Sequence, residues 1–399
     1  MTDLSPASST TETTVGFDLR RTGNTWQRIK EGIIEGILFV AGISSVVITI
    51  GIVVVLLSET IPFFTVPETK TIYTPTVEGA QTLTISKIIA PVGTYVDKGA
   101  PVVEFSSPAG SAVLTATASG KILKILGEVG TTVEMNKHLV DISHLVTLRD
   151  FFVDTLWAPV FDDPRYGIWS LISGTLTTTL VALFVAIPVG TIIAIWLSEY
   201  CYPNVREVLK PSLELLAAVP TVVYGYFALL IVSPVMQWVL GMFGITMGGF
   251  NMLSAGLVMG IMIIPYVASL SEDAMRAVPI QMREGSYAMG ATRVQTALRV
   301  LVPASLSGIT SAYILAIARA VGETMIVALA AGQRPNFTLN PTQEAATISA
   351  AIVQATLGDL PHDSTAYRAI FAAGLMLMLI TLFFNIAGYL IRKRYREAY

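Results

Sequence analysis

The chain has 399 residues, of which 53% are hydrophobic and only 13% are charged, and its mean hydropathy is +0.65. A charged share about half that of an ordinary soluble domain excludes that class and indicates a membrane protein. The formal net charge of -3 gives no sign of a nucleic-acid partner, and the single cysteine, Cys201, excludes an internal disulfide.

The chain begins with a polar segment that leads into a long apolar one. Residues 1–30 start with a run rich in Ser and Thr, so we expect a disordered cytoplasmic tail. Residues 36–58 contain no charged side chain, and about 20 apolar residues are enough for a helix to cross a bilayer. We therefore predict that residues 31–64 form a first transmembrane helix, which is retained and is not cleaved as a signal peptide.

Residues 65–147 have a different composition from the rest of the chain. Short runs rich in Val, Ile and Thr alternate with single glycines, which is typical of short strands and tight turns. Residues 92–105 (VGTYVDKGAPVVEF) align position by position with residues 129–142 (VGTTVEMNKHLVDI). We predict a small all-β domain with an internal repeat, roughly residues 73–143, inserted after the first span.

The remaining segment, residues 148–399, is expected to contain five further spans. They are residues 166–198, two spans within residues 215–271 that the Gly-rich segment 241–250 separates, residues 300–331 and residues 369–391. Six spans place both termini on one side of the membrane, and the Lys and Arg residues of the short connecting segments cluster on that side. The positive-inside rule makes it the cytoplasm, so the β insert is expected outside. The predicted fold class is membrane all-α with a small all-β insert.

A predicted cytoplasmic loop, residues 281–303, carries the first functional signal. It contains Glu284 followed by the small residues Gly285 and Ser286, then Gly290, and it ends in aliphatic residues before Pro303. Such a loop can form a short helix, a glycine turn and a second helix that enters the bilayer. On spacing alone, an ordinary polar connector remains equally open.

Two charged residues, Arg319 and Glu323, interrupt the fifth span. Charges inside a membrane helix are costly and usually face a protein interior or a pathway. Residues four apart stack on one face of a helix, so one interpretation is a structural ion pair. In the other, Arg319 offers a planar fork of donors to a tetrahedral oxyanion, while Glu323 holds it and limits how tightly the anion binds.

The loop at residues 281–303 resembles the coupling loop of importer-type ABC permeases, which docks on an ATP-hydrolysing subunit. Glu284, Gly290 and Pro303 fall on the pattern of that loop, while Gly285 and Ser286 replace its two usual alanines and keep their small size.

Three further motifs resemble the phosphate ABC transporter permease family, specifically its PstC-type subunit, a binding-protein-dependent transport system inner membrane component. They are ARAVGETM, AAVPTVVYGYFAL (residues 217–229) and GTLTTTLVALFVAIPVGTIIAIWLSEY (residues 174–200). The resemblance covers residues 26–64 and 148–399. It implies a pathway for the substrate along Arg319, Glu323, Thr324, Pro220, Thr221 and Tyr224.

The resemblance implies a permease subunit that moves inorganic phosphate across a prokaryotic cytoplasmic membrane by alternating access. The chain has no Walker A sequence, so ATP hydrolysis is expected on separate subunits and no catalytic residue or cofactor is expected here. The implied partners are a homologous second permease subunit, two copies of an ATP-binding subunit, an extracytoplasmic phosphate-binding protein and the lipid bilayer. Import of another oxyanion (molybdate, tungstate or sulfate) and a role as a phosphate-sensing scaffold remain alternatives.

The β insert departs from the plain permease family, and its two half-repeats resemble a biotinyl/lipoyl domain. Carrier domains modify a lysine at a hairpin tip, which corresponds here to Ala109 and Gly110, and no lysine occurs between Lys98 and Lys121. We expect a docking or spacer module, in preference to a membrane-anchored carrier subunit. The three histidines lack metal-ligand spacing, so no metal site is expected.

Overall fold

The computed structural model describes residues 25–76, 82–107, 110–161 and 164–394. Most of the expected N-terminal tail, residues 1–24, lies outside the described residues. The chain divides into two units, Met1–Val54 and Val55–Tyr399. The first unit holds most of α1 (Thr25–Thr65), a 41-residue apolar helix.

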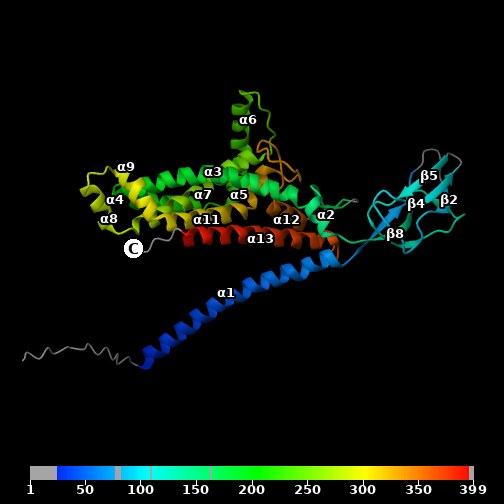
Figure 1. The fold of residues 1–399 in the computed structure, drawn as a ribbon, viewed down its shortest axis with the longest axis horizontal. Coiled ribbons are helices and arrows are strands. Elements are labelled where there is room, and N and C mark those ends of the chain that lie inside the picture. The colour runs from blue at the N-terminus through cyan, green and yellow to red at the C-terminus, as the bar shows by residue number, and fades with distance from the viewer. Residues whose placement is uncertain (1–24, 77–81, 108–109, 162–163, 395–399) are drawn as a thin grey trace, which may run out of the picture. The chain divides into compact units, whose positions relative to one another are not determined.

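The second unit contains the insert and the other helices, with the elements labelled in Figure 1. The insert has strands β1 (Glu68–Tyr73), β2 (Thr82–Ile88), β3 (Tyr95–Val96), β4 (Pro101–Ser107), β5 (Gly110–Thr115), β6 (Gly120–Ile125), β7 (Thr132–Glu134) and β8 (His138–His144). After it come α2 (Leu148–Val153), β9 (Trp157–Ala158), β10 (Arg165–Tyr166), α3 (Trp169–Glu199), α4 (Pro203–Ala217), α5 (Thr221–Phe227), the π-helical η1 (Ala228–Val232) and α6 (Ser233–Gly241). The chain continues with α7 (Met252–Arg276), α8 (Ile280–Ala288), α9 (Arg293–Thr296), η2 (Ala297–Leu301), α10 (Val302–Ala304), α11 (Leu306–Val321), η3 (Val327–Ala331), α12 (Ile348–Leu357) and α13 (Thr365–Arg394).

The helices agree in number and order with the predicted spans. Five helical segments of the described chain are long and apolar enough to cross a membrane, and a bent pair of helices makes a sixth candidate. They are α1, α3, the continuous run from α5 to α6, α7 and α13, with the bent pair between α7 and α13. The predicted fold class is confirmed: the protein is a helical membrane protein with a β-sheet region between its first two spans.

The predicted fifth span, residues 300–331, is bent in the structure. Its two parts, Arg293–Ala304 and Leu306–Val321, meet at 75°. Pro303 lies just before the bend and has no backbone N–H to donate, and the hydroxyl of Ser305 donates to the carbonyl of Leu301 at 2.6 Å. Helix α11 then ends, ten residues before the predicted end of the span. Hydropathy gives no sign of the bend, because it is insensitive to the direction of a helix.

Close packing of α3 against α7 forms the centre of the helical part, where the two helices lie side by side in Figure 1. Gly256 and Gly260 of α7 are one turn apart and contact α3. A Cβ added at Gly256 would lie 2.6 Å from the Cβ of Val181, and one added at Gly260 would lie 2.8 Å from the carbonyl oxygen of Ala182. Small residues at this spacing allow membrane helices to approach closely, and they give α7 a fixed position beside the candidate site.

The insert consists of two four-stranded sheets with the strand orders β5-β4-β2-β7 and β1-β8-β6-β3. All the pairings are antiparallel. Exchanging β5, β4, β2 and β7 for β1, β8, β6 and β3 maps one order onto the other. Each half of the internal repeat therefore places its short strand, β3 or β7, in the sheet that the other half builds.

The repeat also appears in the backbone angles of the insert. Gly93 and Gly130 occupy aligned positions and have φ values of 90° and 92°. Gly99, with φ 85°, aligns with Asn136, which has φ 55° and is the only non-glycine residue of the described chain with a positive φ. Asn is among the residues that tolerate this left-handed conformation best. Ala109, at the predicted hairpin tip, lies outside the described residues.

Candidate functional site

The predicted coupling loop, residues 281–303, forms most of α8, a turn, and then α9, η2 and the start of α10. Glu284 and Gly285 are exposed on α8, and nothing lies within 4 Å of a Cβ added at Gly285. Ser286 is half-buried, and its hydroxyl lies 2.9 Å from the hydroxyl of Thr296 on α9. Pro303, also exposed, lies in the first turn of α10. The loop therefore leaves Glu284 and Gly285 open to a partner.

Gly290 ends α8 with a left-handed turn, with φ 81°. Its N–H donates to the carbonyl of Tyr287 at 2.9 Å, and the N–H of Ala291 donates to the carbonyl of Ser286 at 3.2 Å. This pair of bonds is a Schellman motif, in which glycine is the residue that best adopts the required angle. Thr292 then starts α9 with a capping box. The turn predicted at Gly290 is present.

Glu199, at the end of α3, connects α8 to the helical bundle. One of its carboxylate oxygens lies 3.3 Å from Nε of Arg283, an ion pair without hydrogen-bond geometry, and the other accepts from the hydroxyl of Tyr287 at 3.1 Å. Arg283 also donates to the carbonyl of Met275 on α7 at 2.8 Å. Burial, followed by the bond to Glu199, raises the pKa of the Tyr287 phenol. Helix α8 is thus joined to both α3 and α7.

Glu272, near the end of α7, is completely buried and faces three cations. Its carboxylate oxygens lie 2.8 Å from Nε of Arg206, 3.0 Å from Nζ of Lys210 and 3.7 Å from Nε of Arg276. Lys210 also pairs with Asp273. Burial lowers the pKa of Lys210, but the bonds to Asp273 and Glu272 outweigh it, so the pKa is raised overall. Arg206 and Lys210 belong to α4, so Glu272 fixes α4 against α7.

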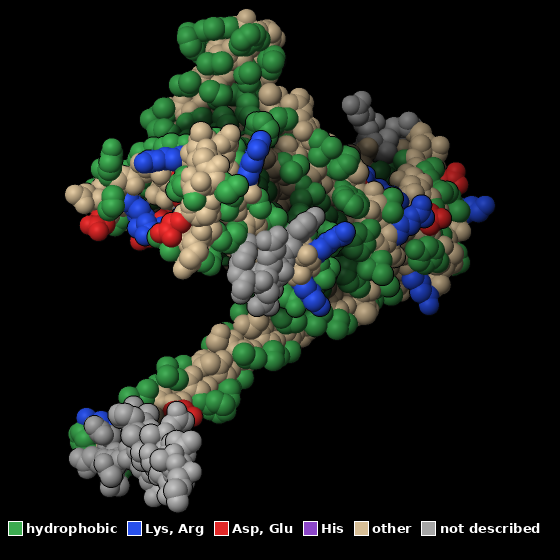
Figure 2. Space-filling view, turned by 60° about the vertical axis from the view of Figure 1, so that its left-hand side comes forward, with side chains coloured by type: hydrophobic (Ala, Val, Ile, Leu, Met, Phe, Trp, Pro, Cys, Tyr) green, Lys and Arg blue, Asp and Glu red, His purple; other side chains and the backbone are tan. Residues whose placement is uncertain are grey.

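The end of the bundle that carries α4, α8 and α9 comes forward in Figure 2. Basic side chains lie there among many hydrophobic ones. The exposed apolar residues of this end include Tyr202, Val208, Ile280, Met289 and Leu298. This mixed surface surrounds the loop at residues 281–303.

Arg319 lies half-buried in the last turn of α11. Its guanidinium carbon is 4.3 Å from the centre of the Tyr266 ring on α7. Its Nε is buried and has no hydrogen-bond partner among the described residues. No ion pair joins Arg319 to Glu323 in the described part of the chain, so the expectation that Glu323 holds Arg319 was wrong. Because α11 ends at Val321, the two side chains do not share a helix face.

Glu323 instead caps the helical segment that follows. Its carboxylate accepts from the backbone N–H groups of Met325 at 3.1 Å and Ile326 at 3.4 Å. Its carbonyl accepts from the hydroxyl of Ser349 on α12 at 2.6 Å. Thr324 beside it is half-buried. The break between α11 and the next helical turn is therefore held in place from α12.

The Pro-Thr-Val-Val-Tyr-Gly motif starts α5 and packs against η3. Pro220 is exposed just before the helix, and Thr221 is half-buried at its first position. The hydroxyl of Tyr224 donates at 3.0 Å to a carbonyl near the end of α4. A Cβ added at Gly225 would lie 2.8 Å from Cδ1 of Leu329 on η3. The motif and the segment after Glu323 are therefore neighbours.

Sequence reasoning does not single out Tyr266, which lies between these groups. Its ring contacts Arg319, and its hydroxyl donates to the carbonyl of Ala217 at the end of α4 at 3.2 Å. The only sequence signal is a Pro-Tyr pair inside an uncharged apolar run. Glu199 and Glu272 also escape notice, because each lies just past the end of such a run.

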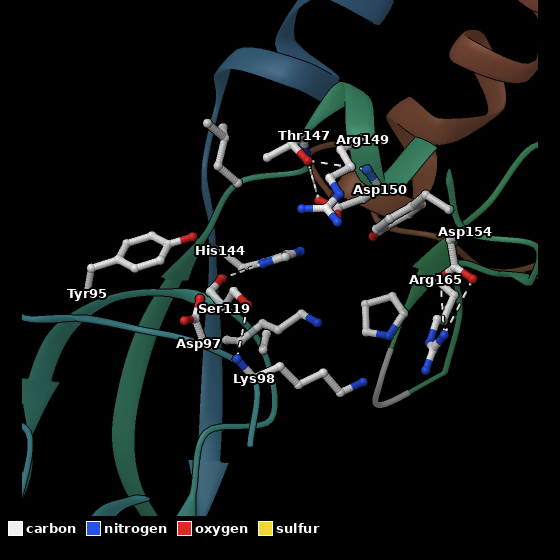
Figure 3. A pocket seen from close by; sticks show the side chains of 15 residues that line it. Tyr95, Asp97, Lys98, Ser119, His144, Thr147, Arg149, Asp150, Asp154 and Arg165 are labelled. Carbon is white, nitrogen blue, oxygen red and sulfur yellow. Dashed lines mark hydrogen bonds and ion pairs between the residues drawn. The ribbon is translucent and has the colours of Figure 1, made fainter. Parts of the chain in front are cut away.

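A polar pocket of about 450 Å³ lies between the insert and the segments α2 and β10 (Figure 3). Its charged lining consists of Lys70, Lys98, Arg149 and Arg165 together with Asp97, Asp150 and Asp154. Arg165 pairs with Asp154 at 3.2 Å, and Nδ1 of His144 donates to the carbonyl of Ser119 at 2.8 Å. The charged and polar groups of the lining thus contact each other, and they come from both the insert and the segment that follows it. Across the described residues, no cluster of His, Cys, Asp and Glu could hold a metal ion.

Residues 186–397, just over half of the chain, match the model of the family described as "Binding-protein-dependent transport system inner membrane component". A probable ABC transporter permease protein of Bacillus subtilis, YqgH, is 33% identical over 246 residues, which are 61% of this chain and 78% of that protein. The phosphate transport system permease protein PstC of Mesorhizobium japonicum is 31% identical over 262 residues, with the same two coverages. PstC of Haemophilus influenzae is 33% identical over 250 residues, 58% of this chain and 76% of that protein.

Among solved structures, an inward-facing MetNI methionine ABC transporter overlaps 58% of this chain and 95% of its own, with 17% identity and a TM-score of 0.43. The family match covers most of the helical bundle and the loop at residues 281–303. The chain therefore belongs to the family of inner membrane components of binding-protein-dependent transport systems.

Proposed function

We propose that the chain is the permease subunit of an ATP-driven importer that moves inorganic phosphate across the cytoplasmic membrane. The observation that carries the proposal is Arg319, a permanently charged side chain among apolar helices that pairs with no carboxylate in the described chain. A planar fork of N–H donors suits a tetrahedral oxyanion. Phosphate is favoured as the anion because relatives at 31% and 33% identity are named phosphate transport system permease proteins.

The proposed cycle is alternating access, in which this chain binds and positions but performs no bond chemistry. Two ATP-binding subunits dock on the loop at residues 281–303, where Glu284 and Gly285 are exposed. Their movement passes through Glu199 to α3 and through Glu272 from α7 to α4. A homologous second permease completes the pathway, and an extracytoplasmic binding protein delivers the phosphate. The distribution of Lys and Arg supports cytoplasmic termini.

The test is uptake of labelled phosphate by the complete complex in liposomes. We expect Arg319→Ala to abolish uptake and Arg319→Lys to retain a small part, because lysine keeps the charge without the planar fork. Arg334→Ala, which removes an exposed arginine beyond η3, is the matched control and should leave uptake unchanged. Uptake by Arg319→Ala at the wild-type rate would refute the proposed role of Arg319.

Competition identifies the transported anion in the same assay. Excess unlabelled phosphate should suppress the signal, while sulfate, molybdate and tungstate should not. Stronger suppression by one of these three would assign the permease to that oxyanion. A phosphate-sensing scaffold predicts instead that Arg319→Ala leaves uptake intact while signalling is lost.

The docking role of the loop has its own test. Glu284→Lys should uncouple the complex, so that phosphate no longer stimulates ATP hydrolysis. Glu207→Lys reverses another exposed glutamate, on α4, and serves as the control. If phosphate stimulates ATP hydrolysis equally in both variants, the loop is an ordinary connector and not the docking site.

We further propose that the β insert, residues 65–147, is an extracytoplasmic docking or spacer module for the binding protein. The absence of a lysine between Lys98 and Lys121 argues against a covalent carrier. Deletion of residues 73–143 should weaken the affinity of the complex for its binding protein. Unchanged uptake together with unchanged affinity would contradict this role.

A further inference from the structure

Arg319 has an unusual set of partners for a charged residue among membrane helices. Its Nε is buried and makes no hydrogen bond among the described residues, and no carboxylate of the described chain forms an ion pair with it. The contact that does stabilise its charge is with the face of the Tyr266 ring, 4.3 Å from the guanidinium carbon. An aromatic face attracts a cation through its quadrupole but carries no net charge. The positive charge of Arg319 is therefore held without being neutralised.

Tyr266 is itself fixed at its other end. It follows the buried Pro265 in α7, and its hydroxyl donates to the carbonyl of Ala217 at 3.2 Å. Tyr224 makes a parallel bond to the carbonyl of Leu216 at 3.0 Å. The last carbonyls of a helix have no i+4 partner within the helix, and the phenol of Tyr266 supplies a donor to one of them, that of Ala217. The carbonyl of Leu216 accepts from Tyr224 and also from the N–H of Val219 at 3.3 Å. The ring of Tyr266 is thus anchored between α4 and α7.

We infer that Tyr266 is a positioning residue for anion transport, which holds the guanidinium of Arg319 in the pathway by its ring face. The inference rests on the proposed function, in which Arg319 binds the transported anion. A neutral aromatic partner fixes the direction of the guanidinium fork and leaves its charge for the anion. A carboxylate in the same place would compete with the anion for the same donors.

The experiment compares phosphate transported per ATP hydrolysed by the complete complex in liposomes, with the binding protein at saturation. Tyr266→Phe keeps the ring and removes the hydroxyl, whereas Tyr266→Leu and Tyr266→Met remove the ring. Loss of a desolvated cation–π contact should lower the transport ratio by about tenfold in the Leu and Met variants. Tyr266→Phe should stay within about threefold of wild type, because the ring face remains.

Tyr313 provides the matched control. It is a half-buried tyrosine of α11 whose hydroxyl lies 2.7 Å from that of Thr191. Tyr313→Phe and Tyr313→Leu should lower the thermal stability of the complex as much as the Tyr266 variants do, while the transport ratio stays near wild type. A merely structural role for Tyr266 would make the two positions behave alike.

Two results would overturn the inference. One is a wild-type transport ratio in both Tyr266→Leu and Tyr266→Met. The other is an equal loss in Tyr266→Phe and Tyr266→Leu, which would assign the effect to the hydroxyl and its bond to Ala217. If the wild-type complex carries a different anion, the proposed function fails on its own, and the same ratio measured with that anion still tests Tyr266.

Discussion

Replacing Glu272 by glutamine tests whether one buried carboxylate holds α4 on α7. The side chain of Glu272 has no exposed surface, and its two oxygens lie 2.8 Å from Nε of Arg206 and 3.0 Å from Nζ of Lys210. In Glu272→Gln, one oxygen becomes an amide nitrogen, which can only donate. At least one of the two cations then faces a donor and loses its acceptor.

The size of the effect follows from the burial of the three groups. Breaking a fully buried ion pair by removing one partner costs about 3–5 kcal/mol, since the other charge stays buried. The side chains of Arg206 and Lys210 keep 22% and 20% of their surface exposed, so water compensates them in part. We therefore expect Glu272→Gln to lower the free energy of unfolding by about 2–3 kcal/mol.

The assay is unfolding of the purified permease in mixed detergent micelles, followed by the loss of helical circular dichroism. Asp273→Asn is the control, because Asp273 also pairs with Lys210 but its side chain is 56% exposed. An exposed pair of this kind contributes less than about 1 kcal/mol. If Glu272→Gln is no more destabilising than Asp273→Asn, the argument that burial makes Glu272 the anchor of α4 is wrong.

Substitutions at three further positions probe backbone and packing constraints. Gly290→Ala should weaken the coupling of ATP hydrolysis to uptake and lower the free energy of unfolding by about 1–2 kcal/mol. The reason is that a Cβ disfavours the left-handed backbone angle even where space is free. Unchanged coupling would contradict this prediction. Asn136→Gly should be neutral or stabilising in thermal unfolding, and Asn136→Val should cost about 1–2 kcal/mol, because the aligned Gly99 shares its positive φ. Gly225→Ala should lower the free energy of unfolding by about 1–3 kcal/mol and slow transport, because the new methyl group would lie 2.8 Å from Cδ1 of Leu329. Equal melting temperatures of the variant and the wild type would mean that α5 can move away from Leu329.

Much of the helical fold follows from hydropathy, while the directions of the helices do not. A helix that crosses the lipid needs about 20 apolar residues, and runs of this length can be recognised in the sequence. The 75° bend before Leu306 leaves hydropathy unchanged, since both arms remain apolar. Pro303 is visible in the sequence, but the side to which a chain turns depends on its packing neighbours.

The charged residues of the candidate site can be predicted from the sequence, but the uncharged partner of Arg319 cannot. Arg319 and Glu323 stand out because charges are rare in apolar spans. Their spacing suggests an ion pair, but α11 ends between them and Glu323 caps the next segment. The actual partner of Arg319, Tyr266, is uncharged and lies on another helix. A contact between helices through a neutral ring leaves no periodic pattern in one sequence.

In the β insert, the sequence predicts the local turns but not the long-range pairing of the strands. The aligned glycines predict the repeat and its turns, because positive φ angles demand particular residues. The exchange of β3 and β7 between the two sheets depends on pairing over long separations in the chain. Pairing of this kind is set by packing of the two halves, which no local pattern records.

The strands that begin and end the insert have a consequence for the chain that surrounds it. Glu68, where β1 begins, pairs with His144, where β8 ends. Opposite residues of an antiparallel pair lie about 4.5–5.5 Å apart, so the polypeptide leaves the insert almost where it entered. A short linker could therefore join the two ends of the chain if the insert were removed. The β domain is therefore connected to the rest of the chain through two points that lie next to each other.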